Sequence, residues 1–308
     1  MEGLVDKGVK ADSRQLLDYV RGLEGLKRKE REEKLVSFLE SGGLKPSVQK
    51  LIFPRIRTYI LDFAGRHNHK RLLFSAHYDA VSGSPGANDN ASGVAVLLGL
   101  CLKLRDSGAP VRAVFFDREE AWLRTRWIRL GLLGSLYYVL NHDLNMIDSV
   151  YNLEFCGRGD TLAVWPVQES SRDDPALQRI ERTSRGLNVA PRFAYLPWWV
   201  ISSDHLPFRI RGIRSAASLS LLPPEDIRQL QEFVAGLSLR KALFGARRPI
   251  PGTLSVLHTV RDSSTDLREE SLQLMLSILQ GLIEDFERSS ERPTDERESK
   301  RVDIKRTT

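Results

Sequence analysis

Short apolar runs of strand length alternate with helix-length segments along this chain, and this alternation limits its fold more than any other feature. The strand candidates are RTYILDFAG, RLLFSA, VRAVFFD, SVYNLEF, TLAVW, RFAYL and IRSAASLSLL. Helices are expected over 12–41, in SGVAVLLGLCLKL, and over 173–186, 225–245 and 267–288. Such alternation is typical of an α/β fold with helices on both faces of a central sheet.

The size of the chain fits one large domain. It has 308 residues, of which 41% are hydrophobic, enough for a sizeable core. We expect a single catalytic domain over 1–286, with N-terminal helices within 12–41 and insertions on the sheet scaffold at 122–131 and 223–252. The remaining 287–308 are charged and poor in apolar residues, which predicts a disordered tail.

Charge and cysteine content exclude several classes of protein. The formal net charge is +6, with both signs spread along the chain and no aromatic-basic signature of RNA binding. Two cysteines, Cys101 and Cys156, do not make a disulfide framework. The N-terminus lacks an apolar signal core, and no apolar run has the length of a membrane span. These features predict a cytoplasmic protein without nucleic-acid or membrane partners, and they leave the oligomeric state open.

Several apolar runs end in side chains that bind metals. His77 follows LLFSA, Glu119 and Glu120 follow VRAVFFDR, Glu154 closes VYNLE, and His258 follows LSVL, which we also take as a strand. In open α/β sheets the carboxyl ends of the strands form the ligand-binding edge. Four such endings on four strand candidates therefore predict a metal site at that edge.

A further candidate metal ligand lies in the loop GSPGANDNASG, just before the apolar helix. Asp89 in this loop has two interpretations, a helix cap or turn former, and a carboxylate that bridges two metal ions. Histidine nitrogen and carboxylate oxygen are standard zinc ligands, and a catalytic site keeps a position open for water. Two cysteines are too few for a closed structural zinc site built from cysteine ligands.

The same segments carry a resemblance to a known family. SAHYDAVSGSPGANDNASGVAVLL, FFDREEA with the later GLLGS, SSDHLPFRIRGI and LHTVRDSSTDLREESL resemble the motifs of co-catalytic zinc aminopeptidases, the aminopeptidase Y and bacterial leucyl aminopeptidase type. The matches run in family order from about residue 58 to 285. The resemblance implies a zinc exopeptidase-like fold of three α/β/α layers around a mixed, mostly parallel sheet, and one or two zinc ions per chain.

The resemblance also implies a role for each matching residue. His77 and Glu154 would bind one zinc, Glu120 and His258 the other, and Asp89 would bridge them; Glu119 would act as general base, and Asp79 would support His77. His205 and Asp204 in SSDHLPF, with Trp198 and Trp199 before them, are candidates for the substrate pocket. For His205 and the tryptophans, ordinary core packing is the other interpretation.

Two features depart from the family pattern. The family usually has Asp where this chain has Glu154, and the extra methylene shifts the carboxylate by about 1.5 Å. Ordinary members also lack the segment WLRTRWIRLG (122–131) after the glutamate pair, whereas glutaminyl cyclases, relatives on the same fold, have an insertion of similar length there and use a single zinc.

The sequence therefore predicts zinc-dependent hydrolysis of N-terminal peptide bonds, with Glu119 as general base to the attacking water. Three alternatives stay open. One is a glutaminyl-peptide cyclotransferase with one zinc, another is an amidohydrolase or carboxypeptidase on the same scaffold, and the third is a zinc protein without activity. The presence of Glu119 beside a full ligand set argues against the third.

Overall fold

The computed structural model describes residues 13–63, 70–120, 123–124, 129–165, 173–194, 203–235 and 252–291. Its main sheet has eight strands in the order β1-β2-β4-β3-β7-β10-β8-β9. The strands are β1 (Ser47–Leu51), β2 (Ile56–Asp62), β3 (Arg71–His77), β4 (Val111–Phe116), β7 (Ile147–Leu153), β8 (Thr161–Trp165), β9 (Arg192–Phe193) and β10 (Ala216–Leu222). The central strands β4, β3, β7 and β10 are parallel, and antiparallel pairs flank them, so the predicted mixed, mostly parallel sheet is confirmed.

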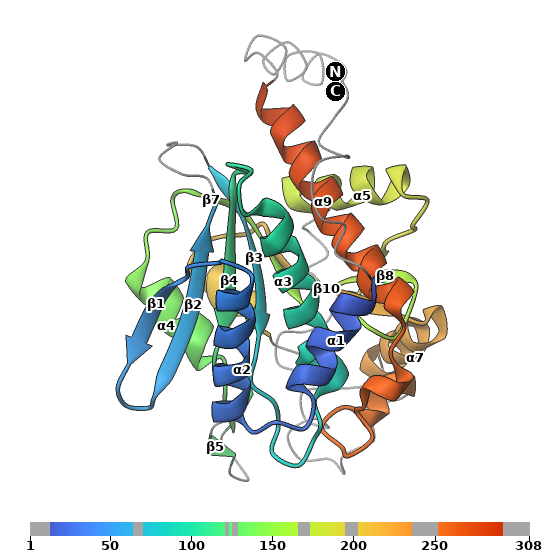
Figure 1. Ribbon diagram of the computed structural model, residues 1–308. Coiled ribbons are helices and arrows are strands. Elements are labelled where there is room, and N and C mark those ends of the chain that lie inside the picture. Colours follow the sequence, from blue (N-terminus) through green and yellow to red (C-terminus); the bar gives the residue numbers. More distant parts are fainter. Residues whose placement is uncertain are drawn as a thin grey trace, which may run out of the picture.

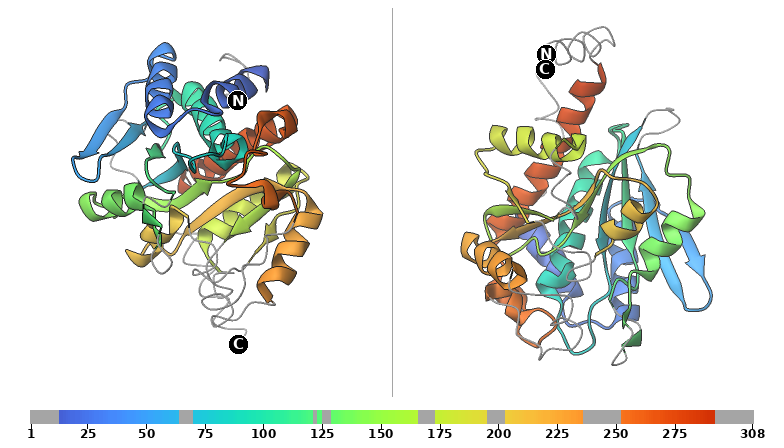
Figure 2. Two further views of the ribbon diagram at one scale, coloured as in Figure 1. Left: turned by 90° about the horizontal axis from the view of Figure 1, so that it is seen from below. Right: turned by 180° about the vertical axis from the view of Figure 1, so that it is seen from behind.

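Helices cover both faces of this sheet and complete three layers (Figures 1 and 2). The helices on one face are α1 (Ser13–Leu23), α2 (Arg28–Ser41), α3 (Ser92–Leu104) and α9 (Glu269–Glu291), with α5 (Pro175–Gly186) packed on α9. Helices α4 (Leu133–Asn141) and α6 (His205–Ile210) lie on the other face, and α7 (Pro224–Ala235) lies by the β8 edge.

Apolar periodicity explains this layering. In α1, the buried residues Leu16, Val20 and Leu23 recur at helical spacing and form one face. Helix α3 is apolar on all sides because it lies between the sheet and the outer helices α1 and α9. A second core on the opposite face contains Tyr138 of α4 and Phe208 of α6.

Most of the predicted elements are confirmed, with shifts of a few residues at their ends. The RFAYL strand is described only as the two residues of β9, and the predicted helix 225–245 is described only as far as Ala235. Strand β1 and helix α4 were not predicted, because each becomes regular through tertiary pairing or packing, β1 against β2 and α4 against the back of the sheet.

The strand predicted in LSVL is wrong. Residues Gly252–Val256 form a 3₁₀ turn, and His258 follows with a φ of 60°. A run of four residues with three apolar members is too short for periodicity to distinguish a strand from a turn. The place beside β10 where such a strand would pair is also taken by β8.

The predicted insertions and tail differ in how much of them is described. In 122–131, Leu123–Arg124 (β5) and Arg129–Leu130 (β6) pair as a small antiparallel ribbon, and in 223–252 the described part is residues 223–235 and Gly252. Helix α9 continues to Glu291, into the segment predicted as a tail, and the Ser289 and Ser290 hydroxyls donate to carbonyl oxygens four residues back. Residues 292–308 lie outside the described part.

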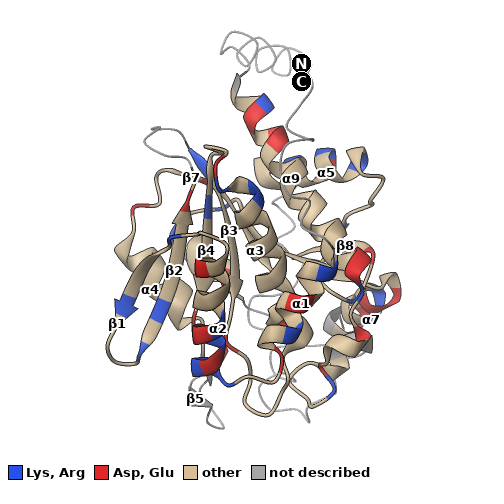
Figure 3. Cartoon of the chain, viewed as in Figure 1, with Lys and Arg blue, Asp and Glu red and all other residues tan. Residues whose placement is uncertain are grey.

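Charged side chains of both signs mix along the same elements, as α2 and α7 show in Figure 3. Within the described ranges, none of the helices combines the length and apolar character that a membrane crossing needs.

The packing of α3 generates a stability prediction. Leu97 is fully buried in the core between the sheet and the outer helices, whereas Ile52, in the β1–β2 turn, is 93% exposed. We expect Leu97→Ala to lower the free energy of unfolding by about 2–5 kcal/mol, because it removes buried methyl groups and leaves a cavity. The matched Ile52→Ala change should stay within about 0.5 kcal/mol. Urea unfolding of both variants measures the difference, and equal effects would contradict the described core.

Candidate metal centre

Three neighbouring parallel strands end at one edge of the sheet with ionisable side chains. His77 is the last residue of β3 and lies in register with Phe116, the last residue of β4. Glu119 and Glu120 follow β4 after a short turn, and Glu154 directly follows β7. Because β3 pairs with both β4 and β7, the acidic residues arrive on either side of His77. This is the lower edge of the sheet in Figure 1, and the left view of Figure 2 looks onto it.

Asp89 stands between two groups of atoms with metal-binding character. In the first group, His77 Nε2 lies 3.4 Å from Asp89 Oδ1 and 3.5 Å from Glu154 Oε2. In the second, His258 Nε2 lies 3.0 Å from both Asp89 Oδ2 and Glu120 Oε1. The donor atoms of each group lie within 4.8 Å of one another. The structure thus brings together all five residues that the sequence analysis assigned to metal binding.

The two groups differ in their access to solvent. His77, Asp89 and Glu154 are buried, whereas the His258 side chain is 38% exposed. Of the five donor residues, His258 is therefore the one most exposed to solvent.

Asp79 holds both sides of the centre. Its backbone carbonyl oxygen lies 3.2 Å from His77 Nδ1, the ring nitrogen that faces away from Asp89, and its Oδ1 lies 3.4 Å from the same nitrogen. The backbone N–H groups of Glu119 and Glu120 donate to the two Asp79 carboxylate oxygens, at 3.1 and 3.2 Å. Asp79 therefore fixes the His77 ring and also the turn that carries the glutamate pair, which the HYD motif alone did not reveal.

Glu119 lies next to the two groups without belonging to either. Its Oε2 is 4.0 Å from His77 Nε2, and its side chain is 11% exposed. The adjacent Glu120 contacts His258 instead. The two acids of the pair thus approach different imidazoles.

A hydrogen-bond network holds the longer side chain of Glu154. Asn152 Nδ2 and Ser203 Oγ both donate to Glu154 Oε1, at 2.9 and 2.6 Å, so that Oε2 is the oxygen that approaches His77. Sequence reasoning missed Asn152 and Ser203. A signal existed for Asn152, since a polar residue two positions before Glu154 in an apolar strand shares its face of the sheet.

The predicted pocket residues lie in different surroundings. His205 is buried, and its Nδ1 is 2.8 Å from the Ser218 hydroxyl, which accepts a hydrogen bond from Asn152. His205 therefore adjoins the network behind Glu154. Asp204 is fully buried beside it. Trp198 and Trp199 lie outside the described residues.

The pKa values of three groups in the centre are raised, each by a different balance of burial and charge. Hydrogen bonds to Asp89 and Glu120 raise the pKa of His258 to about 10. Burial opposes the charged form of His77, but the negative charges of Glu154 and Glu119 outweigh it and raise the His77 pKa. Burial raises the pKa of Glu119 well above its ordinary value.

The pKa values of Asp204 and His205, in the SSDHLPF motif, also depart from their ordinary values. Burial raises the pKa of Asp204 to about 7 and lowers that of His205 to about 3. His205 is therefore neutral at physiological pH, as a buried imidazole beside a hydroxyl should be.

Comparisons with known proteins agree with this geometry. Residues 58–282 match the model of peptidase family M28. Aminopeptidase YwaD of Bacillus subtilis is 31% identical over 168 residues, which are 48% of this chain and 32% of that protein. A vacuolar membrane protease of Kluyveromyces lactis is 25% identical over 159 residues, 51% of this chain and 16% of that protein. The chain thus spans a third or less of these relatives' length, and the cytoplasmic location expected from the sequence stays a prediction.

Solved structures show the same fold. A zinc aminopeptidase from Bacillus subtilis aligns with a TM-score of 0.53 at 22% identity, over 74% of this chain and 49% of that one. Glutaminyl cyclase from Porphyromonas gingivalis aligns with a TM-score of 0.63 at 18% identity, over 90% and 98%. With the motifs in family order and the predicted ligands gathered at one edge, the family match covers most of the fold, and the chain belongs to peptidase family M28.

Proposed function

We propose that this chain is a zinc-dependent aminopeptidase that hydrolyses the N-terminal peptide bond of peptides. The observation that carries the proposal is the pair of donor groups that share Asp89, with Glu119 beside them. Membership of a peptidase family and similarity to an aminopeptidase support the reaction class.

The donor set fits divalent zinc. The two groups together hold three carboxylates and two imidazoles, all of ligand type for this metal. Ligand imidazoles are neutral, so the set would carry a net charge of −3 at a mostly buried place, which is costly without a compensating cation. Without metal, protonated imidazoles would supply part of the compensating positive charge, in accord with the raised pKa of His258. Zinc would take over this role.

We assign one ion to His77, Asp89 and Glu154, and a second ion to Asp89, Glu120 and His258. When bound, zinc supplies Lewis-acid polarisation of the scissile carbonyl and makes water a better nucleophile at neutral pH. The Glu154 carboxylate keeps one oxygen turned to His77 despite its extra methylene, because Asn152 and Ser203 bind the other oxygen.

Glu119 is suited to move the proton. Its carboxylate adjoins the first donor group, and its backbone N–H is anchored on Asp79. It would accept a proton from the attacking water and return it to the leaving amine. Burial raises the Glu119 pKa and so favours its protonated form, which suits a group that holds the proton between the two transfers.

The reaction is tested with aminoacyl-nitroanilides and with peptides that carry N-terminal Gln. We expect cleavage of the nitroanilides, loss of activity on chelation and its recovery on addition of zinc. Full activity in the metal-stripped protein would contradict the metal role.

The same assay separates the second candidate, glutaminyl-peptide cyclisation, which the β5–β6 insertion after the glutamate pair favours. Formation of pyroglutamate without cleavage of the nitroanilides would replace hydrolysis by cyclisation. Cleavage without cyclisation above background would support the aminopeptidase.

The adjacent glutamates give matched variants that test the division of roles. Glu119→Gln should lower kcat by about 10²–10⁴-fold, or roughly 3–5 kcal/mol of barrier, because the amide cannot accept a proton. Its zinc content should stay as in the wild type. Glu120→Gln should lower zinc content, because Glu120 Oε1 belongs to the donor group of His258. Steady-state kinetics and elemental analysis of both variants measure this, and a reversed pattern would exchange the two roles.

A further inference from the structure

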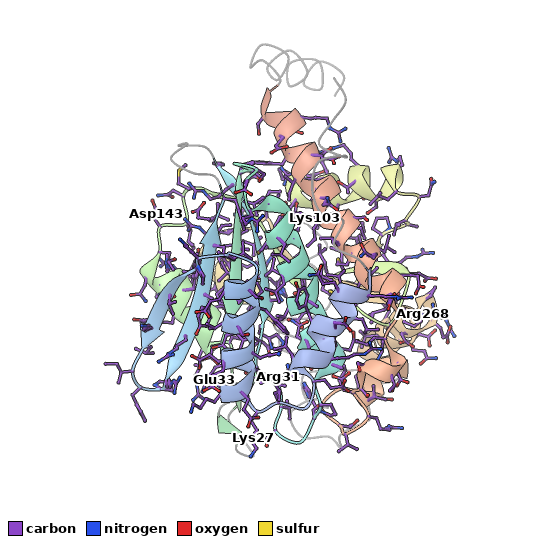
Figure 4. The ribbon with its side chains drawn as sticks, in the orientation of Figure 1. Lys27, Arg31, Glu33, Lys103, Asp143 and Arg268 are labelled. Atoms are coloured by element: carbon purple, nitrogen blue, oxygen red, sulfur yellow. The ribbon has the colours of Figure 1, made fainter. Side chains whose placement is uncertain are left out.

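Arg31 is a fully buried arginine in the first turn of α2 (Figure 4). Within the described part of the chain, its hydrogen bonds go to backbone carbonyl oxygens rather than to a carboxylate. Nη2 donates to Pro85 O at 2.6 Å and to Gly86 O at 3.0 Å, and Nη1 lies 3.5 Å from Tyr78 O. Burying a charged guanidinium costs free energy, so an arginine at this position indicates a structural or functional role.

Three of the four carbonyl oxygens that Arg31 binds belong to the connection between β3 and the segment of Asp89, and the fourth, Leu26 O, accepts from Nε in the turn before α2. Tyr78 lies between His77 and Asp79, and Pro85 and Gly86 lead directly into the segment of Asp89. Arg31 therefore ties the two ends of the connection between β3 and the Asp89 segment together through a single rigid group.

Gly86 is fitted to this contact. It has a φ of 62°, and a Cβ added there would lie 2.6 Å from Arg31 Nη2 and 2.7 Å from the Cβ of Ala80. Only glycine allows the guanidinium to approach the backbone this closely.

Asp262 holds the same loop from its other side. The backbone N–H groups of Asn88 and Asp89 donate to the two Asp262 carboxylate oxygens, each at 3.0 Å, and the N–H of Ala87 donates to the Asp262 backbone carbonyl. Asp262 follows His258 by four residues, so it also ties the Asp89 loop to the loop of His258.

Electrostatic interactions also link Arg31 to the acidic residues of the centre. Burial lowers the pKa of Arg31, and the negative charges of Asp79, Asp89 and Asp262 oppose that shift. The guanidinium is thus a fixed positive charge next to the acidic centre, and arginine keeps its proton in proteins.

We propose that Arg31 is a positioning residue that, with Asp262, fixes the loop of Asp89 and thereby sets the affinity of the centre for its metal. The residue comes from α2, outside the segment 58–282 that matches the peptidase family. The N-terminal helices would then be part of the functional unit and not an appendage. The proposal rests on the metal role of Asp89 put forward above.

The test compares two buried arginines. Arg31→Lys removes the planar group that reaches both ends of this connection and keeps the charge. Arg179→Lys is the matched control, because Arg179 is buried on α5, where it donates to Ser149 Oγ and Tyr151 OH in the body of β7. Both changes should lower the melting temperature of the metal-free protein.

Only the change at Arg31 should weaken metal binding. We expect the dissociation constant for zinc, measured by chelator competition, to rise by about 10–100-fold in Arg31→Lys and to stay unchanged in Arg179→Lys. The visible spectrum of the cobalt-substituted protein should change only in Arg31→Lys. If that variant does not fold, Asp262→Asn carries the test, because its amide nitrogen cannot accept an N–H, and the same loss of affinity is expected.

The outcomes separate this inference from the proposed function. If the wild type binds no zinc, the proposed function fails. If the wild type binds zinc, and the folded Arg31 or Asp262 variant matches the control in affinity and spectrum, the positioning role is wrong and the proposed function stands.

Discussion

The structure of the centre depends on one constraint, which is that several carboxylates lie together at a mostly buried place. Asp89 contributes one oxygen to each of two donor groups, and Glu154 and Glu120 stand on either side of it. Such a cluster repels itself unless cations and hydrogen-bond donors compensate it. The imidazoles of His77 and His258 contact these carboxylates directly, and the Arg31 guanidinium adds a buried positive charge that interacts with Asp89.

The fold restricts the positions of these groups. Strands β4, β3 and β7 are parallel and adjacent, so their ends deliver acidic and imidazole side chains to one edge. The remaining ligands come from loops, and loops need more support. Asp79 anchors the glutamate turn, while Asp262 anchors the loop of Asp89. Donor positions are thus set by hydrogen bonds of the backbone as well as by strands.

Strand periodicity predicted most of the sheet, and polar residues after apolar runs indicated four of the five donor residues, because both are local features; the role of Asp89 was implied by the resemblance to a known family. The sequence did not predict what depends on distant pairing. His258 was assigned to a strand end, but its place comes from a turn after Gly252–Val256. Ser203 and Arg31 act through contacts between segments far apart in the sequence, and no spacing rule connects Arg31 with Pro85.

The central claim is that the two groups around Asp89 are a zinc centre. Anomalous diffraction at the zinc absorption edge, from crystals of the wild-type protein grown with zinc, tests this directly. The account predicts a peak within coordination distance of Asp89, Glu120 and His258, and a second peak within coordination distance of His77, Asp89 and Glu154. No anomalous peak beside Asp89, in crystals where these side chains keep the arrangement described, would contradict it.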